Sequence, residues 1–179
     1  MKGLIQRVTS ASVTVNGEII SNIEKGLCVL IGISNNDTKK DMEYIVRKIL
    51  SVRVFEDESG KKWNKNVVDK DYEILCVSQF TLYNSWKGNK PDFHYAMPGD
   101  SSKEFYENFL QMLKDVYKPE KIKDGLFGAY MQVHIQNDGP VTFELESPAN
   151  LPVKERDRKN NTDKAEANNK EVTNNVDKE

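Results

Sequence analysis

A run of seven residues, Leu27–Ile33, restricts the fold more than any other feature of the chain, because all of them are apolar except one glycine. A strand with apolar side chains on both faces has to be covered on both faces, as in layered α/β proteins. The run is too short to span a bilayer, which takes about 20 residues. It therefore predicts a buried strand inside a layered domain.

Regular alternation predicts further strands around this run. Residues 4–15 alternate and lead into Asn16-Gly17, which is a strong signal for a two-residue hairpin turn. Later in the chain we expect strands at Val52–Phe55, Tyr72–Leu82, Gly128–Gln136 and Val141–Leu145, a turn at Glu58-Ser59-Gly60 and an irregular loop over Asn84–Gly99.

Two amphipathic helices are predicted between the strands, because apolar residues recur there at the spacing of one helix face. The first face comprises Met42, Ile45, Val46, Ile49 and Leu50, after a cap at Asn36 or Asp37. The second comprises Phe105, Phe109, Met112, Leu113 and Val116, after a cap at Asp100, Ser101 or Ser102. The order strands, helix, strands, helix, strands predicts one mixed α/β domain with its helices on one side of a sheet.

The end of the chain differs from the rest in composition. Residues 151–179 contain no aromatic residue, and seven Lys and Arg balance seven Asp and Glu. Such a sequence buries too little apolar surface to offset its ordering entropy, so we predict a folded domain at 1–148 and a disordered, low-complexity tail at 149–179. The domain then carries the whole formal charge of −2. This charge argues against a protein that grips long nucleic acids, but not against one that binds a single RNA end.

Targeting signals and metal-binding patterns are both missing from the sequence. The chain enters a strand-like pattern at once, without a secretory signal, and Cys28 and Cys76 lie in apolar runs. We expect both cysteines to be reduced core thiols of a cytoplasmic protein. No Cys/His spacing indicates a metal site, and we expect no cofactor and no membrane association.

Ser78-Gln79-Phe80-Thr81-Leu82, called the first motif below, puts small polar side chains at the end of an apolar run. It is either an ordinary strand end or a site where hydroxyls and backbone N–H groups meet a substrate carbonyl. A Ser or Thr nucleophile needs a base within hydrogen-bond reach. His94 and His134 are the two histidines, and nothing local requires either to approach, so a nucleophile at Ser78 or Thr81 stays an open alternative.

Asn137-Asp138-Gly139-Pro140-Val141-Thr142, called the second motif, combines a turn signal with a residue that interrupts pairing. Asp-Gly normally makes a hairpin, but Pro140 has no N–H for a ladder. An X-Pro bond can also be cis, and consecutive carbonyls on one side would accept hydrogen bonds from an ammonium group. The motif is therefore either a plain turn or a binding site for the α-amine of an amino acid.

Several charged and aromatic residues have two interpretations each. Arg7 lies within a predicted strand, where it either reaches solvent or pairs with backbone carbonyls. Lys87 and Lys90 are either solvated loop charges or phosphate contacts. Trp63 and Trp86 either pack as part of the fold or stack on a base.

At these residues the chain resembles the D-aminoacyl-tRNA deacylases, also called the D-tyrosyl-tRNA(Tyr) deacylase family. The resemblance runs from Met1 to about Glu146 and includes Gln6-Arg7-Val8, Ala11-Ser12-Val13-Thr14-Val15, the first motif, and Met131-Gln132-Val133 leading into the second motif. The chain departs from the family at Lys90-Pro91-Asp92-Phe93, where Arg-Pro-Ser-Phe is typical.

The resemblance implies a three-layer α/β/β domain and an obligate homodimer with active sites at the subunit interface. It assigns catalysis to Ser78, Gln79, Phe80 and Thr81, and substrate binding to Arg7, Met131, Asn137, Gly139 and Pro140. It also implies that Lys87 and Lys90 contact the end of the RNA. A Gly-cis-Pro unit enters the other subunit's pocket, where its carbonyls hold the substrate's α-amine and Arg7 locks that backbone.

The implied reaction is the hydrolysis of the ester of D-aminoacyl-tRNA, which releases the D-amino acid and tRNA and proofreads chirality in translation. An L-residue is rejected because its side chain would meet rigid backbone. Glycine passes, so glycyl-tRNA formed on tRNA(Ala) is a further expected substrate. The RNA's free 2′-hydroxyl assists the attacking water. A non-catalytic nucleic-acid-binding module and an acyl hydrolase with a side-chain nucleophile are the competing interpretations.

Overall fold

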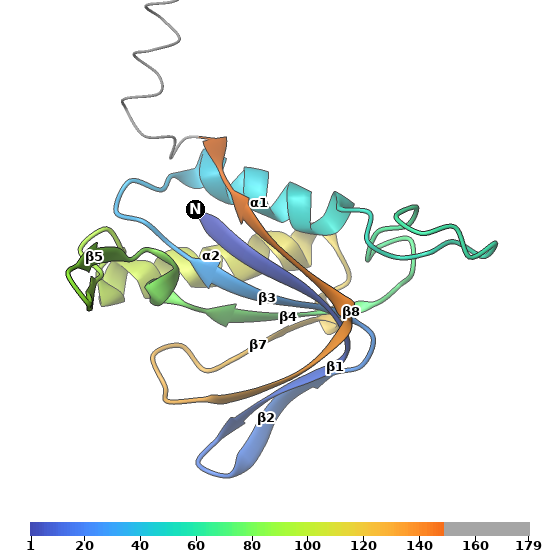
Figure 1. Ribbon diagram of the computed structural model, residues 1–179, viewed down its shortest axis with the longest axis horizontal. Coiled ribbons are helices and arrows are strands. Elements are labelled where there is room, and N and C mark those ends of the chain that lie inside the picture. The colour runs from blue at the N-terminus through green and yellow to red at the C-terminus, as the bar shows by residue number, and fades with distance from the viewer. Residues whose placement is uncertain (149–179) are drawn as a thin grey trace, which may run out of the picture. The chain divides into compact units, whose positions relative to one another are not determined.

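The computed structural model describes residues 1–148 and shows a mixed α/β fold (Figure 1). The main sheet follows the order β2 (Glu18–Ile23), β1 (Lys2–Val15), β3 (Gly26–Gly32), β4 (Glu73–Ser78) and β7 (Ile122–Asp124). β8 (Gln132–Glu146) also pairs with β1. The helices are α1 (Lys39–Ser51) and α2 (Gly99–Val116), with short 3-10 helices η1 (Phe80–Leu82) and η2 (Pro119–Lys121).

The hairpin, the buried strand and the first helix face are confirmed. β1 pairs antiparallel with β2 across Asn16 and Gly17, and both residues have a positive φ, as this turn requires. β3 is buried along almost its whole length between β1 and β4. The predicted face of α1 is buried at all of its positions, namely Met42, Ile45, Val46, Ile49 and Leu50.

Two clusters of apolar side chains form the core. The larger lies between the sheet and the two helices, which Figure 1 shows on the same side of β3 and β4, and it includes Ile31, Ile45 and Phe109. The smaller consists only of strand residues, among them Val13 and Cys28, with side chains of β8 packed against it. Cys28 and Cys76 are free and buried as predicted, and burial raises the pKa of the Cys28 thiol to about 12.

The predicted helix starts are wrong. α1 is capped by Thr38, which forms a capping box with Asp41. Asp37 cannot serve as the cap because its carboxylate accepts from the backbone N–H of Ser34 at 2.7 Å and pairs with the Met1 amino group. α2 already begins at Gly99, since the carbonyl of Pro98 accepts the first helical bond, and Val116 at its end is 67% exposed rather than part of the buried face.

Other predicted strand boundaries also need correction. Val52–Phe55 forms only an isolated bridge from Phe55 to Lys65, and the predicted strand Tyr72–Leu82 spans only Glu73–Ser78. The predicted loop contains a small hairpin of β5 (Ser85–Lys87) and β6 (Lys90–Asp92). β8 starts at Gln132 rather than Gly128 and continues through Gly139-Pro140, although its pairing is shifted there.

Three further predictions concern the turn after Phe55, the tail and membrane association. The turn at 58–60 is confirmed by the hydrogen bond from Gly60 N to the Asp57 carbonyl. The predicted tail, 149–179, lies outside the described residues. Across residues 1–148, neither helix has the length and apolar character that a membrane crossing requires.

Candidate active site

The first motif lies where β4 ends, and its backbone contacts the end of β3. The N–H of Gln79 donates to the carbonyl of Ile31 at 2.7 Å, which ties the motif to the end of β3. Phe80, Thr81 and Leu82 then form η1. Gly32 allows this close approach, because a Cβ there would lie 2.9 Å from the Leu82 Cβ. The core strands therefore fix the backbone of the first motif.

The turn presents backbone donors at its start. Its hydrogen bonds run from Leu82 N to the Gln79 carbonyl and from Tyr83 N to the Phe80 carbonyl. The N–H groups of Phe80 and Thr81 precede these bonds, so they have no partner inside the turn. The Phe80 ring is 55% exposed and contacts Phe93 edge to face. Donors at an accessible turn can stabilise a negatively charged oxygen.

The hydroxyls of the first motif are not arranged as activated nucleophiles. Thr81 Oγ1 accepts a short hydrogen bond from the Gln79 side-chain amide. His94 bonds through Nδ1 to Asp92, and His134 lies on β8. Within residues 1–148, neither the Ser78 nor the Thr81 hydroxyl hydrogen-bonds to a histidine or a carboxylate. This arrangement lacks the base that nucleophilic catalysis requires.

The second motif forms a bulge in β8 opposite Arg7. Gln6 pairs with Thr142 and Val8 pairs with Asn137, so residues 138–141 of β8 stand opposite a single residue of β1. The Gly139–Pro140 peptide is cis, and Gly139 has a φ of +116°, which L side chains rarely adopt. Both residues are exposed. A bulge of this kind turns backbone away from the ladder and toward solvent.

Asn137, the residue before the bulge, holds it with two side-chain hydrogen bonds. Its side-chain oxygen accepts from Val141 N at 3.0 Å, and its amide donates to Thr142 Oγ1 at 3.0 Å. The side chain before the bulge is thereby bonded to the two residues that follow Gly139-Pro140.

Arg7 supports the same bulge from β1. Its Nη1 donates to the Val54 carbonyl at 2.5 Å, which agrees with the expectation that a backbone carbonyl accepts from this guanidinium. Its Nε lies 3.0 Å from Asp138 Oδ2, an ion pair in which the N–H is not aimed at the carboxylate. A Cβ on Gly139 would lie 3.1 Å from Arg7 Nη2, so Arg7 and Gly139 are in close contact. Arg7 therefore links the bulge to the chain that follows α1.

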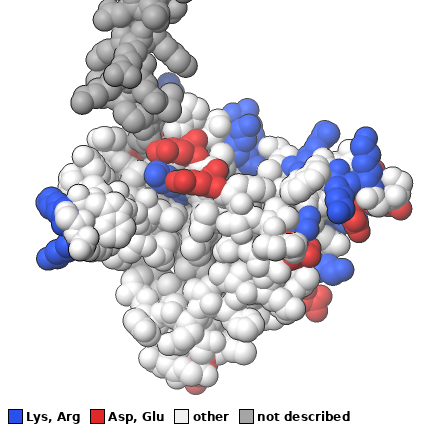
Figure 2. Space-filling model, in the orientation of Figure 1, with Lys and Arg blue, Asp and Glu red and all other residues white. Residues whose placement is uncertain are grey.

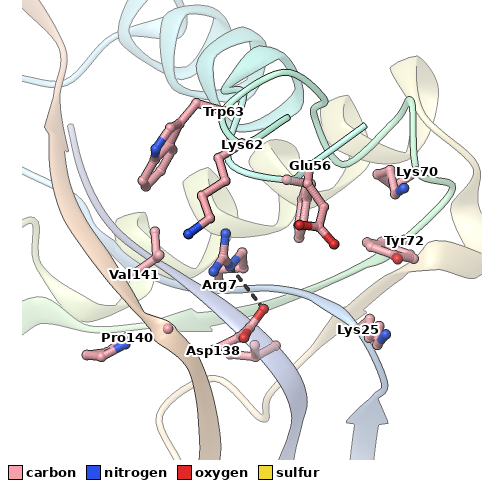
Figure 3. Close-up of a pocket in the computed structure, with 13 residues that line it drawn as sticks. Arg7, Lys25, Glu56, Lys62, Trp63, Lys70, Tyr72, Asp138, Pro140 and Val141 are labelled. Atoms are coloured by element: carbon pink, nitrogen blue, oxygen red, sulfur yellow. Dashed lines mark ion pairs between the residues drawn. The ribbon is translucent and has the colours of Figure 1, made fainter. Parts of the chain in front are cut away.

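A pocket of about 410 Å³ lies beside this bulge. Figure 3 shows the Arg7–Asp138 pair at its centre, with Lys62 and Trp63 reaching in from the loop that follows α1. Gly139, Pro140 and Val141 form one wall, whereas the first motif contributes none of its residues.

The two motifs do not meet within one chain. The first motif is attached at Ile31, which pairs with Gly3 of β1, whereas the second lies opposite Arg7. Gly3 and Arg7 are four positions apart on β1, which corresponds to about 13 Å along a strand. A complete site that uses both motifs would need a second copy of the chain.

The other predicted site residues lie outside this pocket. Met131 packs against the smaller core cluster, and its sulfur accepts from Leu126 N at 3.3 Å. Lys87 pairs with Asp92 at the base of the β5–β6 hairpin, and Lys90 is exposed on the same hairpin. No cluster of side chains suited to a metal ion occurs in residues 1–148.

Several features around the second motif were not predicted from the sequence. They include the Val54 carbonyl and the Asp138 carboxylate as partners of Arg7, and the outer pocket wall with Lys62 beside Trp63. Asp138 belongs to the second motif, so its position was visible in the sequence although its partner was not. Nothing in the local pattern distinguishes Val54 or Lys62 from their neighbours.

Comparison with known proteins places the chain in a family. A family model described as D-Tyr-tRNA(Tyr) deacylase matches residues 4–146. The chain is 68% identical to human D-aminoacyl-tRNA deacylase 1 over 149 residues, which cover 83% of this chain and 71% of the relative. It is 47% identical to the D-aminoacyl-tRNA deacylase of Saccharomyces cerevisiae over 148 residues, which cover 82% and 99%.

Solved structures agree on the fold. One titled "c-Myc DNA Unwinding Element Binding Protein" superposes with a TM-score of 0.81 at 68% identity, over 83% of this chain and 99% of that one. Another, titled as a probable eukaryotic D-amino acid tRNA deacylase, is 17% identical with a TM-score of 0.68 over 80% and 98%, and supports the mixed α/β fold alone. The chain belongs to the D-Tyr-tRNA(Tyr) deacylase family.

Proposed function

We propose that the protein carries out the reaction of its family, the hydrolysis of the ester bond of D-aminoacyl-tRNA, at a site shared by two copies of the chain. The observation that carries this proposal is the separation of the motifs. The first motif has backbone donors but no backbone wall that could exclude an L side chain. It is attached next to Gly3 of β1, whereas the exposed Gly139-Pro140 bulge lies opposite Arg7 of the same strand. Joining the bulge of one subunit to the first motif of the other completes the site.

The surface of β8 is suited to a homodimer of this kind. Its exposed side chains before and after the bulge include Gln132, Gln136 and Thr142, which carry no charge. Glu144 and Glu146, near the end of the strand, pair with Lys2. Figure 2 shows few charged side chains on the central part of this face. The strand-only core cluster also supports a three-layer α/β/β arrangement, in which two strand layers pack beneath the helices. A largely uncharged surface loses little solvation when a second copy covers it.

In this site the bulge selects the handedness of the substrate. The carbonyls of Gly139 and Pro140 from one subunit hold the substrate's α-amine, while the ester lies at the first motif of the other. A D-residue then directs its side chain out of the pocket, whereas an L-residue directs it into backbone. Glycine has no side chain to exclude, so glycyl-tRNA is also a substrate.

Hydrolysis proceeds without a protein nucleophile. As water attacks the ester carbonyl, negative charge develops on its oxygen, and the N–H groups of Phe80 and Thr81 stabilise it. One such donor typically lowers the barrier by about 3 kcal/mol. The 2′-hydroxyl of the terminal ribose assists the water, which fits the lack of a base at Ser78 and Thr81 within the described residues. Lys87 and Lys90 on the hairpin contact the RNA end, in the cytoplasm.

Paired assays with D- and L-tyrosyl-tRNA test the function. The protein should hydrolyse the D-ester and leave the L-ester intact. Equal hydrolysis of both, or of neither, contradicts the proposal. A D-substrate that ends in 2′-deoxyadenosine should bind and react slowly, and normal turnover of it would exclude RNA assistance.

Hybrid dimers test whether the site is shared. Phe80→Pro removes a backbone N–H donor of the first motif at the first residue of η1, and Gly139→Ala disturbs the bulge, so each homodimer should be nearly inactive. Random mixing of the two variants should restore about a quarter of wild-type activity, because half of the dimers are hybrids with one intact site of two. No recovery, with hybrids verified by mass, would place both motifs in the same subunit's site.

The hydroxyl of Thr81 separates backbone-led hydrolysis from a side-chain nucleophile. Thr81→Val keeps the shape and the backbone N–H but removes the acceptor of the Gln79 amide. We expect a loss below about tenfold in kcat, as for a neutral hydrogen bond of roughly 1 kcal/mol. A loss above about 10⁴-fold with D-aminoacyl-tRNA still bound would favour the nucleophile.

A further inference from the structure

The pocket beside Gly139-Pro140 carries a surplus of positive charge although the whole chain has a formal charge of −2. Four basic and two acidic side chains line it: Arg7, Lys25, Lys62, Lys70, Glu56 and Asp138. Figure 2 shows that Lys and Arg also gather over the loop between α1 and β4, which forms the outer wall of this pocket. The lining of the pocket is therefore positively charged, although the whole chain has a net negative charge.

The surplus is not neutralised internally. Arg7 and Asp138 pair with each other. Within the part of the chain that the structure describes, Lys25, Lys62 and Lys70 form no ion pair. Because Asp138 pairs with Arg7, Glu56 is the one acidic side chain of the lining that is left to balance the three lysine ammonium groups. In Figure 3 the Lys62 ammonium points toward Arg7, and Lys25 and Lys70 lie on the opposite side of the cavity. Such an arrangement favours a ligand with negative charge.

The wall that carries Lys62 and Trp63 is held by a hydrogen-bonded turn. The Asp57 carboxylate accepts from Ser59 N at 2.9 Å, from Lys61 N at 3.0 Å and from Asn64 Nδ2 at 2.5 Å. These bonds enclose residues 59–64. The Trp63 backbone has a positive φ of 59°, and its side chain is 56% exposed. An apolar ring held in solvent beside ammonium groups offers a stacking surface for a nucleobase.

We propose that this pocket binds the RNA strand of the substrate just before its terminal adenosine. Lys62, Lys70 and Lys25 hold backbone phosphate, and Trp63 stacks on a base. Its volume of about 410 Å³ lies in the range of small-ligand pockets. The inference rests on the proposed shared site: the RNA whose ester lies at the partner's first motif passes the Gly139-Pro140 bulge, which is also a wall of the pocket. One subunit thus selects the handedness of the amino acid and also binds the RNA.

Kinetics on two substrates test this proposal. D-tyrosyl-adenosine lacks the upstream phosphates, and its hydrolysis by the wild type reports the proposed function independently. Lys62→Gln/Lys70→Gln should raise KM for D-tyrosyl-tRNA about tenfold with kcat unchanged, since the contact is equal in ground and transition states. The slope of log KM against log salt should fall by one to two. Hydrolysis of D-tyrosyl-adenosine should stay within about twofold.

Two further variants make the test directional. Glu56→Gln removes the unpaired acid of the lining and should lower KM for the tRNA. Lys40→Gln, an exposed charge on α1 outside the lining, should change nothing. An unchanged KM in the double lysine variant, or equal losses on both substrates, would overturn the proposal. Inhibition by CMP that the double variant abolishes, with the tRNA KM unaltered, would assign the pocket to free nucleotides instead.

Tryptophan fluorescence gives a readout that does not depend on turnover. The sequence has two tryptophans, so Trp86→Phe leaves Trp63 as the sole reporter. An uncharged RNA minihelix ending in the acceptor sequence should quench Trp63, and adenosine should not. The quenching should disappear when Lys62→Gln/Lys70→Gln is added. Quenching by adenosine alone, or quenching that survives loss of both lysines, contradicts the assignment.

Discussion

The two motifs fix unusual backbone in different ways. The first is held by the core: Gln79 bonds to β3, and Gly32 lets the turn lie against that strand. The second is an exposed bulge held by two polar side chains, Arg7 and Asn137. A buried support resists distortion because every shift disturbs close packing, whereas a braced bulge depends on a few specific bonds. Damage to the first should therefore cost stability as well as activity, and damage to the second mainly activity.

A matched pair of glycine substitutions gives the largest expected effect. In Gly139→Ala the new Cβ would lie 3.0 Å from Val141 Cγ2 and 3.1 Å from Arg7 Nη2, at a φ of +116°. We expect kcat/KM for D-tyrosyl-tRNA to fall about 100-fold or more, as for misplaced binding groups. The fall in melting temperature should be small because the exposed bulge can relax.

Gly32→Ala is the counterpart at the first motif. Its Cβ would lie 2.9 Å from the Leu82 Cβ and 3.4 Å from the Gln79 carbonyl oxygen. Overpacking of this kind costs about 1–3 kcal/mol, so both the melting temperature and the activity should fall. If Gly139→Ala proves the more destabilising of the two in thermal denaturation, the comparison between the regions fails.

Arg7→Lys tests whether the brace needs the shape of the guanidinium. Lysine keeps the charge but cannot reach Val54 and Asp138 together, because it lacks the planar fork. We expect about a tenfold loss in kcat/KM and a reduced ratio of D- to L-tyrosyl-tRNA hydrolysis, on the scale of one or two hydrogen bonds to a charged group. Full activity with an unchanged ratio would show that charge alone suffices.

Asn137 offers a smaller and graded change. Asn137→Ala leaves Val141 N without its acceptor and Thr142 without its donor. The net loss should be about 1 kcal/mol, or roughly fivefold in kcat/KM. Asn137→Asp keeps the acceptor for Val141 N and should retain more activity. The reverse order of the two variants would assign the bracing to the bond with Thr142.

Acid should disturb the hairpin beside the first motif. Lys87 first and His94 next lower the pKa of Asp92, whose carboxylate bonds both at the hairpin beside the first motif. Because this pKa is lowered by folding, its stabilising effect is present above the ordinary value of about 3.9 and is lost as pH falls through the lowered value. Trp86 emission in a Trp63→Phe protein should therefore change below about pH 4.

Asp92→Asn is the control for the acid effect. The variant has no carboxylate to protonate, so its Trp86 emission at neutral pH should match that of the parent in acid. Emission that stays constant in the parent until global unfolding would mean that the hairpin does not depend on Asp92.

The sequence alone determined the elements whose signals are local. The hairpin at Asn16-Gly17, the buried strand at Leu27–Ile33 and the apolar face of α1 follow from turn chemistry and periodicity within a few residues. The two motifs were also visible, because glycine, proline and small polar residues are conspicuous after apolar runs. The predicted cap of α1 was wrong because other groups bind the Asp37 carboxylate. It accepts from Ser34 N and pairs with the Met1 amino group, so Thr38 caps the helix instead.

Only the tertiary structure decided what each motif touches. Arg7 meets Val54, Asp138 and Gly139 because of the register between β1 and β8, and register depends on the whole sheet rather than on any one strand. Lys25, Lys62 and Lys70 share a pocket although 45 residues separate the first from the last. Long-range packing brings such groups together, and no local pattern records it.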